Sequence, residues 1–189
     1  ELRNSQGRPP YGVQLRLIDT DEPLQQVEED GMSQGRLQIK GHWIINDYYT
    51  ENPDAITEDG WFDTGDIATI DADGYMNIRD RSKDLIKSGG EWISSVELEN
   101  IAVAHPQIRM AAAIAAKHKK WSERPVLIVV KEPDSEIDES QVLSFYEGKI
   151  ASWQVPDKVI FVDNIVLNGA GKMVKKDLRD DYGNVLLDS

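Results

Sequence analysis

The segment from Asp80 to Glu99, DRSKDLIKSGGEWISSVELE, constrains the fold of this chain more than any other stretch. An apolar pair, Leu85-Ile86, leads into the turn Ser88-Gly89-Gly90, and Glu91-Trp92-Ile93 returns as a second strand. Glycine accepts the positive φ that tight hairpin turns need. Ser94-Ser95 then predicts a helix start, because a serine hydroxyl can accept from the free N–H groups of a first helical turn. The segment therefore predicts a β-hairpin that leads into a helix.

The Gly-Gly turn has two interpretations. It can simply close a hairpin, or it can let a ligand approach the backbone closely and accept hydrogen bonds from its N–H groups. A hairpin does not need the charged residues that precede this turn, which are Asp80, Arg81, Lys83 and Asp84. Their density favours a binding role.

The charge of the chain changes at the same segment. Residues 1–80 hold 17 acids and 6 bases, whereas residues 81–189 hold 17 acids and 15 bases, within a net charge of -13. The acidic first part argues against nucleic-acid binding, and the second part keeps enough cations for a nucleotide or coenzyme phosphate. Such asymmetry is also compatible with ordinary surface variation.

Several classes of protein are disfavoured by composition. The absence of cysteine excludes a disulfide framework and thiol chemistry. No apolar run approaches membrane-spanning length, and no signal-peptide pattern opens the chain, so a cytoplasmic protein without a transmembrane segment is predicted. The chain begins with Glu1 and without a clear element, and we expect it to be a piece of a longer protein.

The remaining elements follow from periodicity and turn residues. Strands are predicted at residues 13–18, 36–40, 62–70 and 75–79, with turns at Asn52-Pro53 and Asp59-Gly60 between them. After the central segment, helices are predicted at 96–104, 138–152 and 174–182, and strands at 110–116, 125–130 and 159–162. A β-rich part followed by interleaved helices and strands predicts an α+β chain whose second part is a small α/β sandwich.

Three separated motifs carry a resemblance: DGWFDTGDIATIDADGY, DRSKDLIKSGGEWISSVELE and NGAGKMVKKDLR. Together they resemble the C-terminal part of the adenylate-forming enzymes, and KWSERP and SWQVPDKVIFVD are most similar to the fatty-acyl-CoA synthetases within that superfamily. The resemblance implies that residues 1–80 are the β-rich, barrel-like end of a large N-terminal domain. Residues 81–189 would then be the C-terminal α/β lid domain.

The resemblance also implies nucleotide-binding residues. Asp66 matches an aspartate that accepts from both ribose hydroxyls of ATP, a role that suits a carboxylate. Without the resemblance, Asp66 would be interpreted as a turn residue that bonds its own backbone. Arg81 matches a nucleotide-contacting arginine. Lys87 and Trp92 resemble residues near the phosphates, although Trp92 equally fits a core position.

The resemblance implies that Lys172, in Asn168-Gly169-Ala170-Gly171-Lys172, is the catalytic residue. Adenylation is attack of a carboxylate on the α-phosphate of ATP, and a cation beside the developing charge lowers the barrier. The alternative is an exposed lysine ahead of a basic helix. The loop is not a Walker loop, because the spacing G-x-x-x-x-G-K is absent. The family usually carries Ser or Thr just before this Gly-Lys, so Asn168-Gly169-Ala170 is a departure.

The resemblance assigns Lys83 to a hinge about which the lid domain rotates between two half-reactions. It places CoA along Gly89 and Gly90, with aromatic residues near the adenine that correspond to Trp121 and Trp153. Both tryptophans also fit as packing residues. Basic residues that some relatives carry just after Trp153 are replaced here by Val155 and Asp157, which leaves Lys117, Lys119 or Lys120 for the CoA phosphates.

The resemblance implies the function of a fatty-acid–CoA ligase that uses ATP and CoA, with Mg²⁺ held by residues outside this chain. No metal ligands are predicted within it, and the chain alone is expected to be inactive. An aryl- or other carboxylate–CoA ligase is the alternative within the class, and a non-catalytic nucleotide- or CoA-binding module is the alternative outside it. Expected partners are the carboxylic acid substrate and the chain's own N-terminal domain, and a homodimer is left open.

Overall fold

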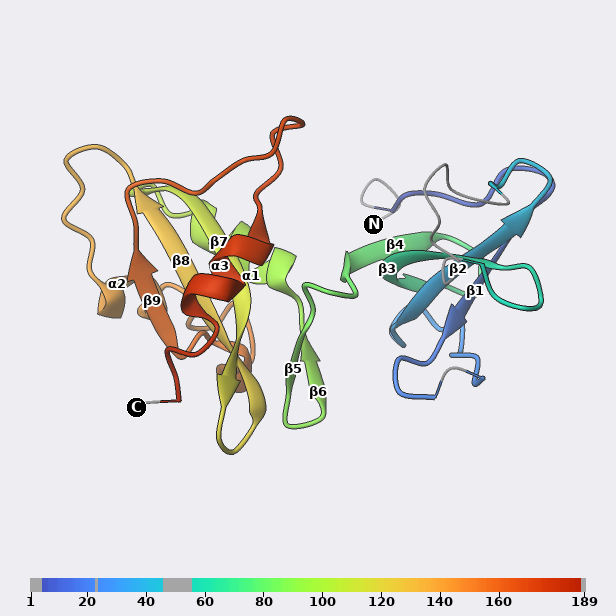
Figure 1. Cartoon of the computed structure of the whole chain (residues 1–189), viewed down its shortest axis with the longest axis horizontal. Coiled ribbons are helices and arrows are strands. Elements are labelled where there is room, and N and C mark those ends of the chain that lie inside the picture. Colours follow the sequence, from blue (N-terminus) through green and yellow to red (C-terminus); the bar gives the residue numbers. More distant parts are fainter. Residues whose placement is uncertain (1–4, 23, 46–55, 188–189) are drawn as a thin grey trace. The chain divides into compact units, whose positions relative to one another are not determined.

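The structure, a computed structural model, describes residues 5–22, 24–45 and 56–187 (Figure 1). The chain forms two compact units, Glu1–Lys83 and Asp84–Ser189. Within the described ranges, none of the helices has both the length and the apolar character needed to cross a membrane. The predicted turn at Asn52-Pro53 lies outside the described residues.

The first unit is an antiparallel sheet of four strands in the order β1-β2-β3-β4. Hydrophobic side chains of this sheet, among them Leu17, Leu37, Ala68 and Ile70, pack into one core cluster. A tight turn joins the last two strands, because the Asp71 carboxylate accepts from backbone N–H groups two and four residues later. The predicted strands are confirmed as β1 (Val13–Ile18), β2 (Gly35–Gly41), β3 (Phe62–Ile70) and β4 (Met76–Arg81).

The second unit is a five-stranded sheet with helices on both faces (Figure 1). Strands follow the order β6-β5-β8-β7, and β9 pairs with β8 in parallel. The strands are β5 (Ile86–Ser88), β6 (Glu91–Ile93), β7 (Ile108–His118), β8 (Ser122–Lys131) and β9 (Lys158–Phe161). The helices are α1 (Ser95–Val103), α2 (Glu139–Ser144), the 3₁₀ turn η3 (Ser152–Gln154) and α3 (Lys175–Tyr182).

Strand β8 lies at the centre of this unit, β7 pairs along it at the edge of the sheet, and most residues of both strands are buried. Successive side chains of a strand point to opposite faces, so alternate residues enter two different cores. Ala111, Ala113, Leu127 and Val129 pack with residues of α1 and α2, while Ala112, Ile114, Val126 and Ile128 pack with Leu178 of α3. The many alanines of β7 are small enough to let the helices approach the sheet closely. The predicted α+β class, with an α/β sandwich in the second part, is confirmed.

One predicted helix is wrong in length. The helix expected at 138–152 begins as expected, with Asp138 as N-cap and a capping box with Gln141, but it ends at Ser144. Tyr146 turns into the core, where it is fully buried and its hydroxyl donates to the Leu98 carbonyl at 2.7 Å. Gly148 then adopts φ +72°, which a helix cannot accommodate.

Candidate functional site

Asp66 and Arg81, both predicted to contact the nucleotide, lie opposite each other on β3 and β4. Arg81 Nε lies 3.0 Å from Asp66 Oδ1, and Arg81 Nη1 donates to the Thr64 carbonyl at 3.1 Å. The Asp66 side chain is 17% exposed, whereas that of Arg81 is 52% exposed. The ion pair therefore orients both groups while the guanidinium stays open to a ligand.

The Thr64-Gly65-Asp66 segment takes its shape from local hydrogen bonds. Gly65 has φ +72°, and its carbonyl accepts from the Ser82 N–H at 2.9 Å. The Thr64 hydroxyl accepts from the Asp66 N–H at 3.1 Å and donates to the Leu37 carbonyl, also at 3.1 Å. These bonds fasten the segment to β2 and to the end of β4, which holds the Asp66 carboxylate in place.

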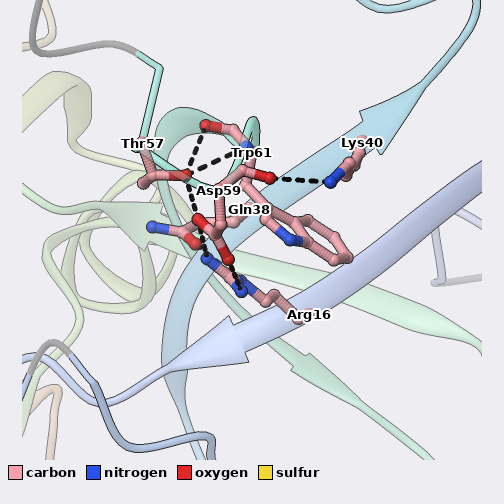
Figure 2. A network of polar contacts seen from close by, with 6 residues as sticks. All are labelled: Arg16, Gln38, Lys40, Thr57, Asp59 and Trp61. Atoms are coloured by element: carbon pink, nitrogen blue, oxygen red, sulfur yellow. Dashed lines mark hydrogen bonds and ion pairs between the residues drawn. The ribbon is translucent and has the colours of Figure 1, made fainter.

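A polar network not foreseen from the sequence holds the segment that leads into β3 (Figure 2). Two Arg16 nitrogens donate to the Asp59 carboxylate at 2.8 and 3.2 Å, and Arg16 also lies over the Trp61 ring at 4.4 Å. Lys40 donates to the Asp59 carbonyl at 2.7 Å. Hydrogen bonds from Arg16 and then from Thr57 lower the pKa of Asp59 from 3.8 to about 2. The network ties residues 57–61 to β1 and β2.

Lys83, the predicted hinge residue, is exposed and is the last residue of the first unit. The next residue, Asp84, is anchored within the second unit, because Arg179 of α3 donates to its carboxylate at 2.6 Å. The chain therefore becomes fixed to the second unit immediately after Lys83.

The predicted CoA turn is a two-residue hairpin loop between β5 and β6, with φ +61° at Gly89 and +96° at Gly90. Trp121 packs directly on Gly89: a Cβ on that glycine would lie 2.8 Å from Cε3 of the indole. The Gly89 N–H donates to the Trp121 carbonyl at 2.9 Å. The structure thus brings together the turn and one of the two predicted tryptophans.

Lysines lie over two of the predicted tryptophans. Lys87 and Trp92 face each other across β5 and β6, with the ammonium 4.9 Å from the centroid of the half-buried indole. Lys120 lies 4.5 Å from the Trp121 centroid. Such pairs are attractive, and each places a cation over one face of the indole.

Trp153 lies in η3 and is 43% exposed. Its carbonyl accepts from Arg124 Nη1 at 2.6 Å. Arg124 is a residue that sequence analysis missed, although an arginine at the start of an apolar strand run, RPVLIVV, is a signal that a buried charge needs partners.

Lys172 lies on a separate hairpin and is exposed. Asn168 organises this loop: its side-chain oxygen accepts from the N–H groups of Ala170 at 2.9 Å and Lys172 at 3.0 Å, and its own N–H donates to the Lys172 carbonyl at 2.8 Å. In the segment where the family usually carries Ser or Thr, this chain therefore has Asn168, which closes the loop through these hydrogen bonds. Gly171 has φ +76°, so it supplies a backbone conformation that the turn needs and that a residue with a side chain rarely adopts.

The helix that follows Lys172 is held by a buried ion pair. Lys175 Nζ lies 2.6 Å from Glu99 Oε1 and donates to the Ser95 hydroxyl at 2.7 Å. Glu99 also accepts from the Ala113 N–H of β7 at 2.8 Å. The start of α3 is thereby fixed to α1 and to the central sheet, three residues after Lys172.

No metal centre accompanies these residues in the part of the chain that the structure describes. There, no three side chains of His, Cys, Asp or Glu come close enough to hold an ion.

Comparison with known proteins shows what this chain is similar to. Residues 97–172 match the AMP-binding enzyme C-terminal domain. The chain is similar to a medium-chain-fatty-acid–CoA ligase of Ectopseudomonas oleovorans, with 56% identity over 100% of this chain and 34% of that protein. The similarity to a CoA ligase thus runs along the whole chain, and the matched domain family accounts for residues 97–172.

Two further proteins are similar to this chain over nearly its whole length. A 3-methylmercaptopropionyl-CoA ligase of Ruegeria lacuscaerulensis is 54% identical over 98% of this chain and 34% of that protein. The crystal structure of ATP-bound MatB from Rhodopseudomonas palustris superimposes with a TM-score of 0.84 and 31% identity, over 97% of this chain and 36% of that one. The chain thus spans about a third of the length of these relatives.

Proposed function

We propose that this chain is the C-terminal part of an ATP-dependent fatty-acid–CoA ligase and that it is inactive without the rest of that enzyme. The observation that carries the proposal is the 56% identity to a medium-chain-fatty-acid–CoA ligase along the whole chain. In the first half-reaction, a carboxylate oxygen attacks the α-phosphorus of ATP and pyrophosphate leaves. In the second, the CoA sulfur attacks the acyl carbon and AMP leaves.

In the first half-reaction, Asp66 would accept from the ribose hydroxyls and Arg81 would contact the nucleotide. Their ion pair supports this role, because it holds the carboxylate at a defined angle. Lys172 would stabilise charge on the phosphoryl oxygens. Its place on an exposed, Asn168-closed hairpin supports this, since the loop can enter a site contributed by another domain.

In the second half-reaction, CoA would lie along Gly89 and Gly90, with Trp121 and Trp153 near its adenine. Lys87 and Trp92 would lie near the phosphates, and Lys83 would be the hinge. The boundary between the two compact units, directly after Lys83, supports its assignment as the hinge residue. Mg²⁺ would neutralise phosphate charge, and we expect its ligands outside this chain.

A short thioether acid is the second candidate substrate. The 54% identity to a 3-methylmercaptopropionyl-CoA ligase is almost as high as the identity to the fatty-acid ligase. Both similarities cover this part of the enzyme, whereas we expect the acyl pocket to lie elsewhere in the full-length protein. The identity of the acid is therefore a matter for assay.

The test uses the full-length protein as wild type, Lys172→Ala and a matched control, Lys176→Ala, which changes an exposed lysine on α3. Pyrophosphate release is measured with medium-chain fatty acids and with 3-methylmercaptopropionate, and thioester formation is measured separately from preformed acyl-adenylate. We expect Lys172→Ala to slow pyrophosphate release by about 100-fold or more, the scale of a lost transition-state contact, and to retain thioester formation. Lys176→Ala should leave both steps unchanged.

Two results would refute the proposal. If the wild type activates no carboxylic acid, the chain is not part of a ligase, and a nucleotide- or CoA-binding module becomes the better hypothesis. If Lys172→Ala releases pyrophosphate at the wild-type rate, the assignment of Lys172 fails.

A further inference from the structure

Arg124, on β8, donates five side-chain hydrogen bonds within the second unit. Its Nε and Nη2 both donate to Asp157 Oδ1, at 2.8 and 2.6 Å. Nη1 donates to the Ser88 hydroxyl at 3.0 Å and to the Trp153 carbonyl at 2.6 Å, and Nη2 also donates to the Val155 carbonyl at 3.0 Å. The whole residue is only 9% exposed.

These bonds join two segments that are far apart in sequence. Ser88 is the last residue of β5 and immediately precedes the Gly89-Gly90 turn. Trp153 and Val155 belong to η3 and its end, and Asp157 immediately precedes β9. Arg124 therefore connects the turn to the segment that carries Trp153.

Trp121, the other tryptophan predicted to lie near CoA, is joined to the same turn by different contacts. Trp121 lies three residues before Arg124, packs on Gly89 and accepts its N–H. The adjacent Glu123 accepts from the Lys87 N–H at 2.9 Å, which fastens β5 to β8 a second time. Turn and both tryptophans are thus arranged around one short stretch of β8.

A guanidinium is well suited to this position. Its planar fork can donate in several fixed directions at once, whereas an ammonium is a compact charge with three donors. A buried cation is tolerated only when paired and hydrogen-bonded, and Asp157 supplies the negative charge. The structural role of Asp157 in this chain is therefore to pair with Arg124.

We propose that Arg124 is a positioning residue for CoA: it sets the distance between the Gly89-Gly90 turn and Trp153, and so shapes the surface on which the coenzyme lies. The inference rests on the proposed function. Arg124 itself is covered and does not need to touch the coenzyme. Its substitution should therefore weaken CoA binding and leave adenylation, which uses other residues, unaffected.

The test compares full-length wild type with Arg124→Lys, Ser88→Ala and Arg109→Lys, the last being the same change at an exposed arginine of β7. KM and kcat for CoA are measured in thioester formation from preformed acyl-adenylate, and pyrophosphate release is measured in parallel. Arg124→Lys should raise the KM for CoA by about tenfold, the effect of losing bonds to a charged group, with pyrophosphate release within about twofold of wild type. Ser88→Ala should raise KM less, and Arg109→Lys should not change it.

An unchanged KM in folded Arg124→Lys would overturn the proposal, as would an equal fall of both half-reactions, which is the result of a merely structural role. If Arg124→Lys does not fold, Ser88→Ala decides by the same criterion. If the wild type forms no adenylate with any acid, the proposed function fails on its own. Calorimetric titration of wild type and Ser88→Ala with CoA then decides the inference, and equal affinities would refute it.

Discussion

The contact between Gly89 and Trp121 predicts a large and specific cost for a single methyl group. Alanine at Gly89 meets two penalties. Positive φ costs an L-residue about 1–2 kcal/mol. The added Cβ would also lie 2.8 Å from Trp121 Cε3, and overpacking of this kind costs about 1–3 kcal/mol. Because Trp121 is 42% exposed and its ring can turn outward, we expect the overpacking cost to lie in the lower half of its range.

Gly90 is the matched control, since it also has positive φ but a Cβ there would meet no atom within 4 Å. Gly89→Ala and Gly90→Ala are therefore each made with Trp121 present and with Trp121→Ala. The free energy of unfolding is measured by urea titration, and hydrogen exchange of the β7 and β8 amides reports on the unit that carries the turn. We expect Gly89→Ala and Trp121→Ala to couple by about 1–2 kcal/mol, and Gly90→Ala and Trp121→Ala not to couple. Equal coupling for both glycines, or none for Gly89, would refute the argument.

Two other contacts make testable predictions. Glu99→Gln should lower the free energy of unfolding, measured by urea titration, by about 3 kcal/mol, because it leaves the Lys175 ammonium, whose side chain is 11% exposed, without its carboxylate. Adding Lys175→Met should restore most of this loss, and a double variant as unstable as Glu99→Gln would contradict the prediction. The pKa of Asp59 lies below its unfolded value of 3.8, so its contribution to stability is present above that pH and is lost as the pH falls through about 2. Carbon-detected NMR titration should show Arg16→Gln raising this pKa towards 3.8, and an unchanged midpoint would exclude Arg16 as the main cause.

Local sequence signals predicted the elements that depend on neighbouring residues. Ser94 is the N-cap of α1, as expected, and its hydroxyl accepts from the Glu97 N–H. The hairpin over 86–93 was predictable because glycine is the residue that accepts positive φ at both turn positions. The helix expected at 138–152 is wrong in length because the apolar pattern of the sequence continues past Ser144, whereas the chain leaves the helix there and Gly148 adopts a positive φ.

The sequence by itself determined the strand pattern, the Ser94 and Asp138 helix caps, the motifs that carry the resemblance and the candidate residues Asp66, Arg81, Gly89, Gly90 and Lys172. Only the tertiary structure decided how these residues are held. Arg124 contacts Ser88 and Asp157 across 36 and 33 positions of sequence, and Lys175 reaches Ser95 across 80. Periodicity and capping operate within one or two helical turns. A buried charge instead pairs with acceptors that are distant in sequence, and the packing of the folded chain determines which of them lie within hydrogen-bond distance.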